Sequence, residues 1–318
     1  MNNILPWHES LWQQTLARKL PHALLLSGPS GMGKVEFAKN LAETLLCEQK
    51  QTCGNCKPCN LLKANTHPDL LLIQPADTGK QIAVDQIRSM IKFCALTAKY
   101  SGYQIAIIEP AEAMNRNAAN SLLKLLEEPP DNTLIMLVSN KPMALSATIR
   151  SRCQKLDFSW PDKTLTHNWL NEQLTNQKQT ALLLSLSAQA PLAAFKLADS
   201  MSKRQELFDS LMTLQTNDPV KIAATWAKME VISVLKWQLS WTADVIRYST
   251  TGQTQHLVNQ DQLTSLQNFA NHLNLQKLFK LLDLQQEAYQ LLTSNTNIKP
   301  QGLLEMIAIA WIELKRRT

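Results

Sequence analysis

The sequence has no long hydrophobic run and no recognisable export signal. Its longest apolar stretches, such as LIMLVS at 134–139, are the size of strands, whereas about 20 residues are needed to span a bilayer. The opening MNNILPWHES lacks the basic start and the apolar stretch of a secretion signal. We therefore expect a cytoplasmic protein with no membrane partner.

The chain also lacks a strong charge of either sign. Its 32 basic and 26 acidic residues leave a net charge of +6, which permits contact with DNA phosphates but does not argue for it. No basic pattern interleaved with aromatic residues is present, which counts against a stand-alone zinc-dependent nucleic-acid-binding module. The length of 318 residues and the apolar fraction of 45% predict two or three ordinary globular domains.

The first half of the chain alternates short apolar runs with amphipathic stretches. The apolar runs predict five strands, at 22–28, 69–75, 103–110, 133–140 and 154–158. Helices are predicted between and before them, at 8–20, 34–47, 84–96, 115–130 and 144–150. Strands that are apolar throughout are typical of a parallel sheet covered on both faces. Residues 1–160 are therefore predicted to form an α/β domain.

Strand signals end after Trp160, and the rest of the chain is predicted to be helical. Short helical patterns occupy 163–200, and longer ones follow at 204–214, 220–250, 262–293 and 300–317. Glycine and proline are sparse inside these patterns. We predict a small helical domain over 161–203 and an all-α domain over 204–318.

The stretch GPSGMGKV at 28–35 has the form of a phosphate-binding loop. It follows a predicted strand and opens a predicted helix, which is the context this motif needs. Gly28, Gly31 and Gly33 let backbone N–H groups turn toward phosphate oxygens, and Lys34 is placed to reach the β- and γ-phosphates. A chance glycine-rich turn explains this pattern less well.

Two elements needed for ATP hydrolysis are missing. Position 35, where a hydroxyl normally ligates Mg²⁺, is Val35. The strand that should end in two acidic residues ends in Glu109 and Pro110, and proline cannot act as a general base. Glu112 is predicted to be a solvated charge at a helix start. The sequence thus indicates a site that is not built to cleave a nucleotide, and it leaves open whether one still binds.

Four of the six cysteines lie within thirteen positions: Cys47, Cys53, Cys56 and Cys59. In a cytosolic protein such a cluster favours a metal over disulfides. Four thiolates complete a tetrahedral Zn²⁺ site, so we predict structural zinc. His67 is predicted to lie at a turn rather than on the metal.

These motifs together resemble a known family. SLLKLLEEPP at 121–130, SRC at 151–153 and the four-cysteine insert behind the phosphate loop resemble the AAA+ clamp-loader ATPases of bacterial replication. The resemblance is strong over 1–160 and weak over the tail, although 295–311 looks like that family's last helix. It implies an AAA+ P-loop domain, a helical lid and a C-terminal helical collar that joins subunits.

The departures from the family pattern all point to a subunit without ATPase activity. Active members carry Asp-Glu where this chain has Glu109-Pro110, and an arginine in the lid, whose counterpart at 187–195 (SAQAPLAAF) has none. In the family, the arginine of Ser-Arg-Cys reaches the ATP site of a neighbouring subunit, which gives Arg152 the role of an arginine finger. Ser139-Asn140 falls where the family senses the γ-phosphate, and a purely structural turn is equally consistent.

The resemblance also implies partners. We expect a stator-like subunit of the DNA polymerase III holoenzyme, a nucleotidyltransferase complex, that assembles with gamma/tau and delta subunits in a hetero-pentamer. The complex would load the sliding clamp onto primed DNA in the nucleoid-associated replisome. The alternative is an ATP-hydrolysing motor subunit, gamma/tau-like, of the same complex. The sequence leaves the stoichiometry, the polymerase partners and direct DNA contacts open.

Overall fold

The computed structural model describes residues 4–77, 80–100, 102–270, 273–293 and 298–314. The chain divides into two compact units, one of residues 1–172 with 190–193 and one of 173–189 with 194–318. The predicted division into three domains, with boundaries after 160 and 203, stays a prediction. The basic chain end at 315–317 lies outside the described residues.

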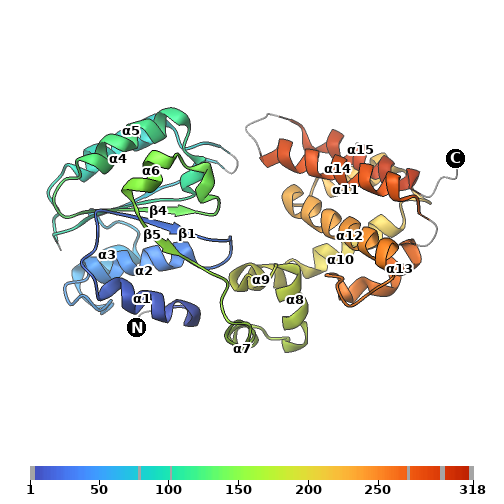
Figure 1. Cartoon of the computed structure of the whole chain (residues 1–318), viewed down its shortest axis with the longest axis horizontal. Helices are drawn as coiled ribbons and strands as arrows, with labels where there is room; N and C mark the ends of the chain where they lie inside the picture. Colours follow the sequence, from blue (N-terminus) through green and yellow to red (C-terminus); the bar gives the residue numbers. More distant parts are fainter. Residues whose placement is uncertain (1–3, 78–79, 101, 271–272, 294–297, 315–318) are drawn as a thin grey trace. The chain divides into compact units, whose positions relative to one another are not determined.

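The first unit is built on a five-stranded parallel sheet (Figure 1). Its strands are β1 (Ala23–Ser27), β2 (Leu70–Ile73), β3 (Gln104–Ile108), β4 (Thr133–Ser139) and β5 (Gln154–Asp157). They run in the order β2-β3-β4-β1-β5, every neighbouring pair parallel, so the five predicted strands and the parallel sheet are confirmed. Because β1 and β4 are central, the residues that follow them meet at the carboxyl edge of the sheet.

Helices cover both faces of this sheet. They are α1 (Glu9–Leu16), α2 (Lys34–Leu46), α3 (Lys57–Lys63), α4 (Val84–Cys94), α5 (Arg116–Glu127) and α6 (Ala147–Arg152), with short 3₁₀ turns η1 (Pro6–His8), η2 (Ala111–Ala113) and η3 (Pro142–Ala144). The helix α7 (Lys163–Gln173) follows the last strand. In Figure 1 the helices α4, α5 and α6 lie on one side of the sheet, and α1, α2 and α3 lie on the other.

Alternation along the strands explains the two layers. Ala23 and Leu25 of β1 join the core beneath α4, α5 and α6, whereas Leu24 and Leu26 join the core beneath α1 and α2. Successive side chains of a strand point to opposite faces, so a strand apolar at every position is buried on both. The helix α3 was not predicted. It begins where Pro58 occupies the first turn, a position at which proline costs no hydrogen bond.

The second unit is all-helical. Its elements are η4 (Gln177–Gln179), α8 (Thr180–Leu186), α9 (Pro191–Ala198), α10 (Met201–Met212), α11 (Pro219–Trp226), α12 (Val231–Thr251), η5 (Gln260–Gln262), α13 (Leu263–Ala270), α14 (Leu275–Thr293) and α15 (Pro300–Glu313), with α9 shared between the units. This confirms the helical tail, and Trp226, Trp237, Trp241 and Trp311 are buried in its core, as predicted.

Two of the long helices predicted for the tail are each divided in two, so these two predictions were wrong. The stretch predicted at 220–250 breaks between α11 and α12, where the Glu230 carboxylate accepts the backbone N–H of Ser233 at 2.7 Å and caps a new helix. The stretch predicted at 262–293 breaks before α14, where the Asn274 side chain accepts the N–H of Gln276 at 2.8 Å. Because the helical spacing of apolar residues continues across both caps, the sequence pattern did not indicate the breaks.

Taken singly, none of the described helices has the length and apolar character to cross a membrane. Only when two helices joined by a bend are counted together, 177–186 and 191–198, are that length and apolar character met.

Candidate functional site

The phosphate loop connects β1 to α2 and adopts backbone angles that favour glycine. Gly33 caps α2 with a φ of 90°, in the left-handed region, and Gly28 has a φ of 154°. A side chain at Gly28 would also meet the carbonyl oxygen of Phe158 at 2.4 Å. Only glycine fits this path, so the predicted loop conformation is present.

Lys34 does not point into open solvent but is enclosed by the loop. Its side chain is only 3% exposed, and its Nζ donates to the carbonyl oxygens of Gly28 at 2.8 Å and Pro29 at 2.5 Å and to Oδ1 of Asn140 at 2.8 Å. An ammonium group has three donors, and three acceptors of this chain take them. The group that would bind phosphates is therefore saturated by protein oxygens.

Burial and nearby carboxylates shift the pKa of Lys34 in opposite directions. Desolvation lowers its pKa to about 8, while the negative charges of Glu112, Glu36 and Glu109 raise it. The ammonium form thus predominates at neutral pH, and its charge is balanced within the chain.

Residues ahead of the first strand close the loop from outside. Trp7 Nε1 and His8 Nε2 both lie within hydrogen-bond distance of the Met32 carbonyl oxygen, at 2.9 and 2.8 Å. A carbonyl only accepts, so His8 carries its proton on Nε2. Burial lowers the pKa of His8 to about 4, although its bond to Met32 opposes the shift and the charge of Lys34 adds to it. Sequence reasoning missed both residues, because a lone Trp-His pair before a strand has no motif.

Residues 190–193, part of the segment predicted at 187–195, also reach the loop. The backbone N–H of Leu192 donates to the Gly31 carbonyl at 3.1 Å, and a side chain at Gly31 would meet the Cβ of Ala193 at 2.8 Å. Family members with active sites were expected to place an arginine in this segment, and here small apolar residues lie against the loop instead.

The remaining positions of the predicted nucleotide site lie around this loop. Val35 is half-buried and packs against the core beneath α1 and α2. Glu109 follows β3, and its Oε2 accepts from Gln74 Nε2 at 2.6 Å, while Pro110 follows through a cis peptide. Neither a hydroxyl at position 35 nor a carboxylate at position 110 is available.

Glu112 was predicted to be solvated, and this was wrong. Its Oε1 accepts the backbone N–H of Asn140 at 3.0 Å, and its Oε2 is buried without a partner among the described residues. Asn140 therefore connects Glu112 to Lys34. The 3₁₀ turn η2 after β3 folds the carboxylate back onto the end of β4, and sequence spacing alone could not indicate that fold-back.

Arg152 lies apart from the loop, at the end of α6. Its Nη2 donates to Glu127 Oε1 at 2.6 Å and its Nη1 to the carbonyl oxygen of Thr148 at 3.1 Å. Its side chain is 34% exposed. The arginine is thus accessible, and within the described part of the chain its charged partner is Glu127, from the end of α5.

The four predicted metal ligands converge in one place. The sulfur atoms of Cys47, Cys53, Cys56 and Cys59 all lie within 4.8 Å of one another. The Cys47–Cys56 and Cys53–Cys59 pairs are 4.0 and 3.9 Å apart. Tetrahedral zinc with bonds of about 2.3 Å separates its sulfurs by about 3.8 Å, so the donor set and its spacing fit a metal ion. His67 is not part of the cluster, since its Nδ1 accepts the N–H of Asp69 at 3.1 Å.

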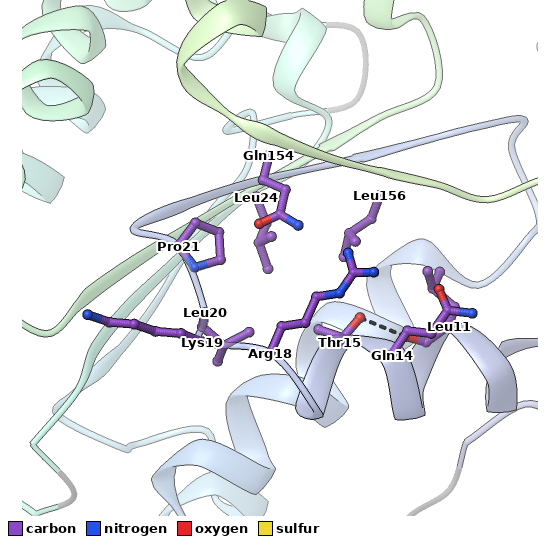
Figure 2. A pocket seen from close by; sticks show the side chains of 10 residues that line it. All are labelled: Leu11, Gln14, Thr15, Arg18, Lys19, Leu20, Pro21, Leu24, Gln154 and Leu156. Atoms are coloured by element: carbon purple, nitrogen blue, oxygen red, sulfur yellow. Dashed lines mark hydrogen bonds between the residues drawn. The ribbon is translucent and has the colours of Figure 1, made fainter.

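A small cavity elsewhere in this unit lies between α1 and the strands β1 and β5 (Figure 2). Its volume is about 40 Å³, and Arg18 and Gln154 are among the side chains that line it. This space suits a few water molecules and is far too small for a nucleotide. None of the predicted site residues lines it.

Comparison with known proteins identifies the family. A family model described as "DNA polymerase III, delta subunit" matches residues 7–162, and one described as "DNA polymerase III, delta subunit, C terminal" matches 198–313. "DNA polymerase III subunit delta'" of Pseudomonas aeruginosa is 34% identical over 99% of this chain and 99% of its own length. The chain belongs to the delta-prime family of DNA polymerase III clamp-loader subunits.

Two further comparisons are consistent with membership in this family. The Escherichia coli protein of the same name is 32% identical, covering 87% of this chain and 86% of its own length. A solved DNA polymerase III gamma subunit-related protein of Thermotoga maritima matches 98% of this chain and 100% of its own, with a TM-score of 0.51 at 17% identity. That likeness shows the fold alone, and it agrees with the predicted α/β domain followed by a helical region.

Membership in the delta-prime family confirms the predicted resemblance to clamp loaders and a function in DNA replication. The individual roles predicted for Lys34, Glu109 and Arg152 stay predictions.

Proposed function

We propose that this delta-prime chain is a non-hydrolysing, stator-like subunit of the clamp loader. It supports ATP-driven loading of the sliding clamp onto primed DNA in the cytoplasmic replisome and donates Arg152 to the ATP site of a neighbouring ATPase subunit. Its partners are gamma/tau and delta subunits in a hetero-pentamer joined through helical collar domains, of which residues 204–318 form one.

The saturated ammonium of Lys34 is the observation that carries the non-hydrolysing role. Any phosphate that bonds to Lys34 must first displace a protein oxygen from its ammonium group. Val35 offers no ligand to Mg²⁺ and Pro110 no general base, so a nucleotide that did enter would meet neither the metal nor the water-activating group. We therefore expect the isolated chain neither to hydrolyse ATP nor to bind it measurably.

The accessibility of Arg152 supports its role in trans. Arginine presents a planar fork of donors that matches phosphate oxygens, and α6 carries this fork at its last residue, partly exposed. An arginine finger contributes about 10³–10⁵-fold to the turnover of the site it completes.

The test is an assembled clamp loader in which only the ATP site facing Arg152 keeps its phosphate-loop lysine. Arg152→Ala is expected to abolish nearly all of the remaining ATPase activity, whereas the isolated delta-prime chain shows no activity with or without Lys34→Ala. An unchanged rate in the Arg152→Ala complex refutes the finger. ATPase activity of the isolated chain that Lys34→Ala removes identifies a motor subunit instead.

We also propose that Cys47, Cys53, Cys56 and Cys59 hold a structural zinc ion. The cluster immediately follows α2, and with all four donors supplied by protein no position is left for a reactant. Metal analysis of the purified chain is expected to find one equivalent of zinc, and strong chelation is expected to expose four reactive thiols and lower the thermal stability. Four reactive thiols in protein that has never been chelated would contradict the assignment.

A further inference from the structure

The contact between Arg152 and Glu127 has properties that the proposed finger does not explain. Both terminal nitrogens of the guanidinium are occupied, Nη2 by Glu127 Oε1 at 2.6 Å and Nη1 by the Thr148 carbonyl at 3.1 Å. These are the nitrogens that a phosphate would meet. The side chains of Arg152 and Glu127 are 34% and 49% exposed, so an incoming ligand can reach the pair.

Glu127 lies where helix physics disfavours it. It is the last residue of α5, and Glu128 follows at the cap, so two carboxylates sit at the negative end of the helix dipole. Among the described residues Glu128 has no ion pair, whereas Glu127 is neutralised by Arg152. The two carboxylates and the helix dipole at the end of α5 thus favour a cation there, and Arg152 supplies one.

The other arginine of α6 gives a contrast. Arg150 Nη1 donates to the carbonyl oxygens of Pro142, Met143 and Leu145, all backbone groups of the preceding turn. Those contacts hold the turn in shape and have no charged competitor. Arg152 is bonded to one backbone carbonyl, that of Thr148, and to the carboxylate side chain of Glu127, which can rotate away.

The helices that carry the pair are fixed by packing. Leu122 and Leu125 of α5 and Ile149 of α6 are buried in the same hydrophobic core. Exchange of the partner of Arg152 therefore requires only side-chain rotation, with no movement of α5 or α6.

We propose that Glu127 is a positioning residue that retains the Arg152 guanidinium at the α5–α6 junction and competes for it with the terminal phosphate of the nucleotide in the neighbouring subunit. This inference rests on the proposed role of Arg152 in trans. A terminal phosphate carries more negative charge than a carboxylate and offers three acceptor oxygens, so it displaces Glu127 when the neighbour holds ATP. Glu127 thereby raises the ATP concentration that is needed for Arg152 to join the ATP site of the neighbouring subunit.

The test uses the same single-site clamp loader, with ATPase activity measured over a range of ATP concentrations. Glu127→Gln keeps the shape of the side chain and removes its charge, and Glu128→Gln is the matched control from the same helix end. An exposed ion pair corresponds to about a two- to fivefold change in an equilibrium. We expect Glu127→Gln to lower KM for ATP by about that factor and to leave kcat unchanged, while Glu128→Gln changes neither.

The double variant Glu127→Gln, Arg152→Ala separates the possible results. If Glu127 acts through Arg152, the double variant has the same activity as Arg152→Ala alone. A KM that is unchanged or raised in Glu127→Gln, or lowered equally in Glu128→Gln, overturns the inference while Arg152→Ala still abolishes turnover. If Arg152→Ala has no effect, the proposed function fails and this inference fails with it.

Discussion

The phosphate loop and the α5–α6 junction each present a cation from a nucleotide-handling motif, and they treat it in opposite ways. Lys34 is 3% exposed and is bonded to two backbone carbonyls and the side-chain amide of Asn140. Arg152 is 34% exposed and is bonded to one surface carboxylate and one carbonyl. The first cation has become part of the structure, whereas the second can still exchange its partner.

The difference shows that a motif can be retained for two different reasons. Glycines and a lysine are needed to form the turn between β1 and α2, because the lysine satisfies carbonyls that the tight turn directs inward. Such a loop keeps its residues whether or not a nucleotide binds. The partly exposed Arg152 makes fewer contacts within the fold, which is consistent with the role in trans that we propose for it.

The largest effect expected at the loop comes from acid. His8 is buried in its neutral form with a pKa of about 4, against about 6.5 when exposed, so the unfolded chain binds more protons between these values. Stability contributed by neutral His8 is fully present above about pH 6.5 and is lost as the pH falls toward 4, by about 3 kcal/mol in all.

Chemical denaturation at pH 7 and pH 5 is expected to show about 2 kcal/mol of this loss in the wild-type chain. The response should be flatter in His8→Gln, which keeps an N–H donor for Met32. His67 contributes in the same direction, since burial lowers its pKa as well, and it is unchanged in both proteins. If NMR titration gave His8 an ordinary pKa, the loop would not be closed by a buried neutral ring. The contrast between an enclosed phosphate loop and an accessible α5–α6 junction would then fail.

A smaller effect is expected from Lys34→Met, which keeps most of the aliphatic stem and removes the ammonium. The half-buried carbonyls of Gly28 and Pro29 and the exposed amide of Asn140 each lose a donor, and unpaired acceptors of this kind cost about 1 kcal/mol. Denaturation curves should show this loss, while Lys39→Met, an exposed position on the same helix, is nearly neutral. The ATPase rate of an assembled loader is expected to stay the same, and a rate that fell in parallel with Arg152→Ala would make the two cations equivalent.

The smallest effect is expected from Val35→Thr, which restores the hydroxyl that normally ligates Mg²⁺. The side chains have similar shapes and position 35 is half-buried, so stability should change by about 1 kcal/mol or less. No ATPase activity is expected in the isolated chain, because Lys34 remains saturated and Pro110 remains in place. Magnesium-dependent hydrolysis by Val35→Thr would show that one hydroxyl was all the loop lacked.

Much of this architecture could be predicted from local pattern. Four of the strands are almost wholly apolar, the first helices are amphipathic, and the cysteines are close enough along the chain to meet. The helix α3 and the breaks before α12 and α14 were not predicted, because they depend on single caps and on Pro58 rather than on periodicity. Element type follows from many residues at once, whereas boundaries follow from one or two.

The candidate site was predictable only in part. The glycines, Lys34 and Arg152 were found from their motifs, since their spacing along the chain is short and fixed. The closure by Trp7 and His8 was not found, nor was the fold-back of Glu112 onto Asn140. These contacts join residues about 25 or more positions apart, and nothing in their local sequence indicates a partner.

The sequence by itself determined the parallel α/β unit, the helical tail, the cysteine cluster and the departures at Val35 and Pro110, because each depends on residue type and short spacing. Only the tertiary structure decided that Lys34 is enclosed and that Arg152 rests on Glu127. Both are matters of which oxygen lies nearest to a cation. That choice is made where the chain packs against distant parts of itself, since hydrogen bonds depend on tenths of an ångström that no pattern of residues encodes.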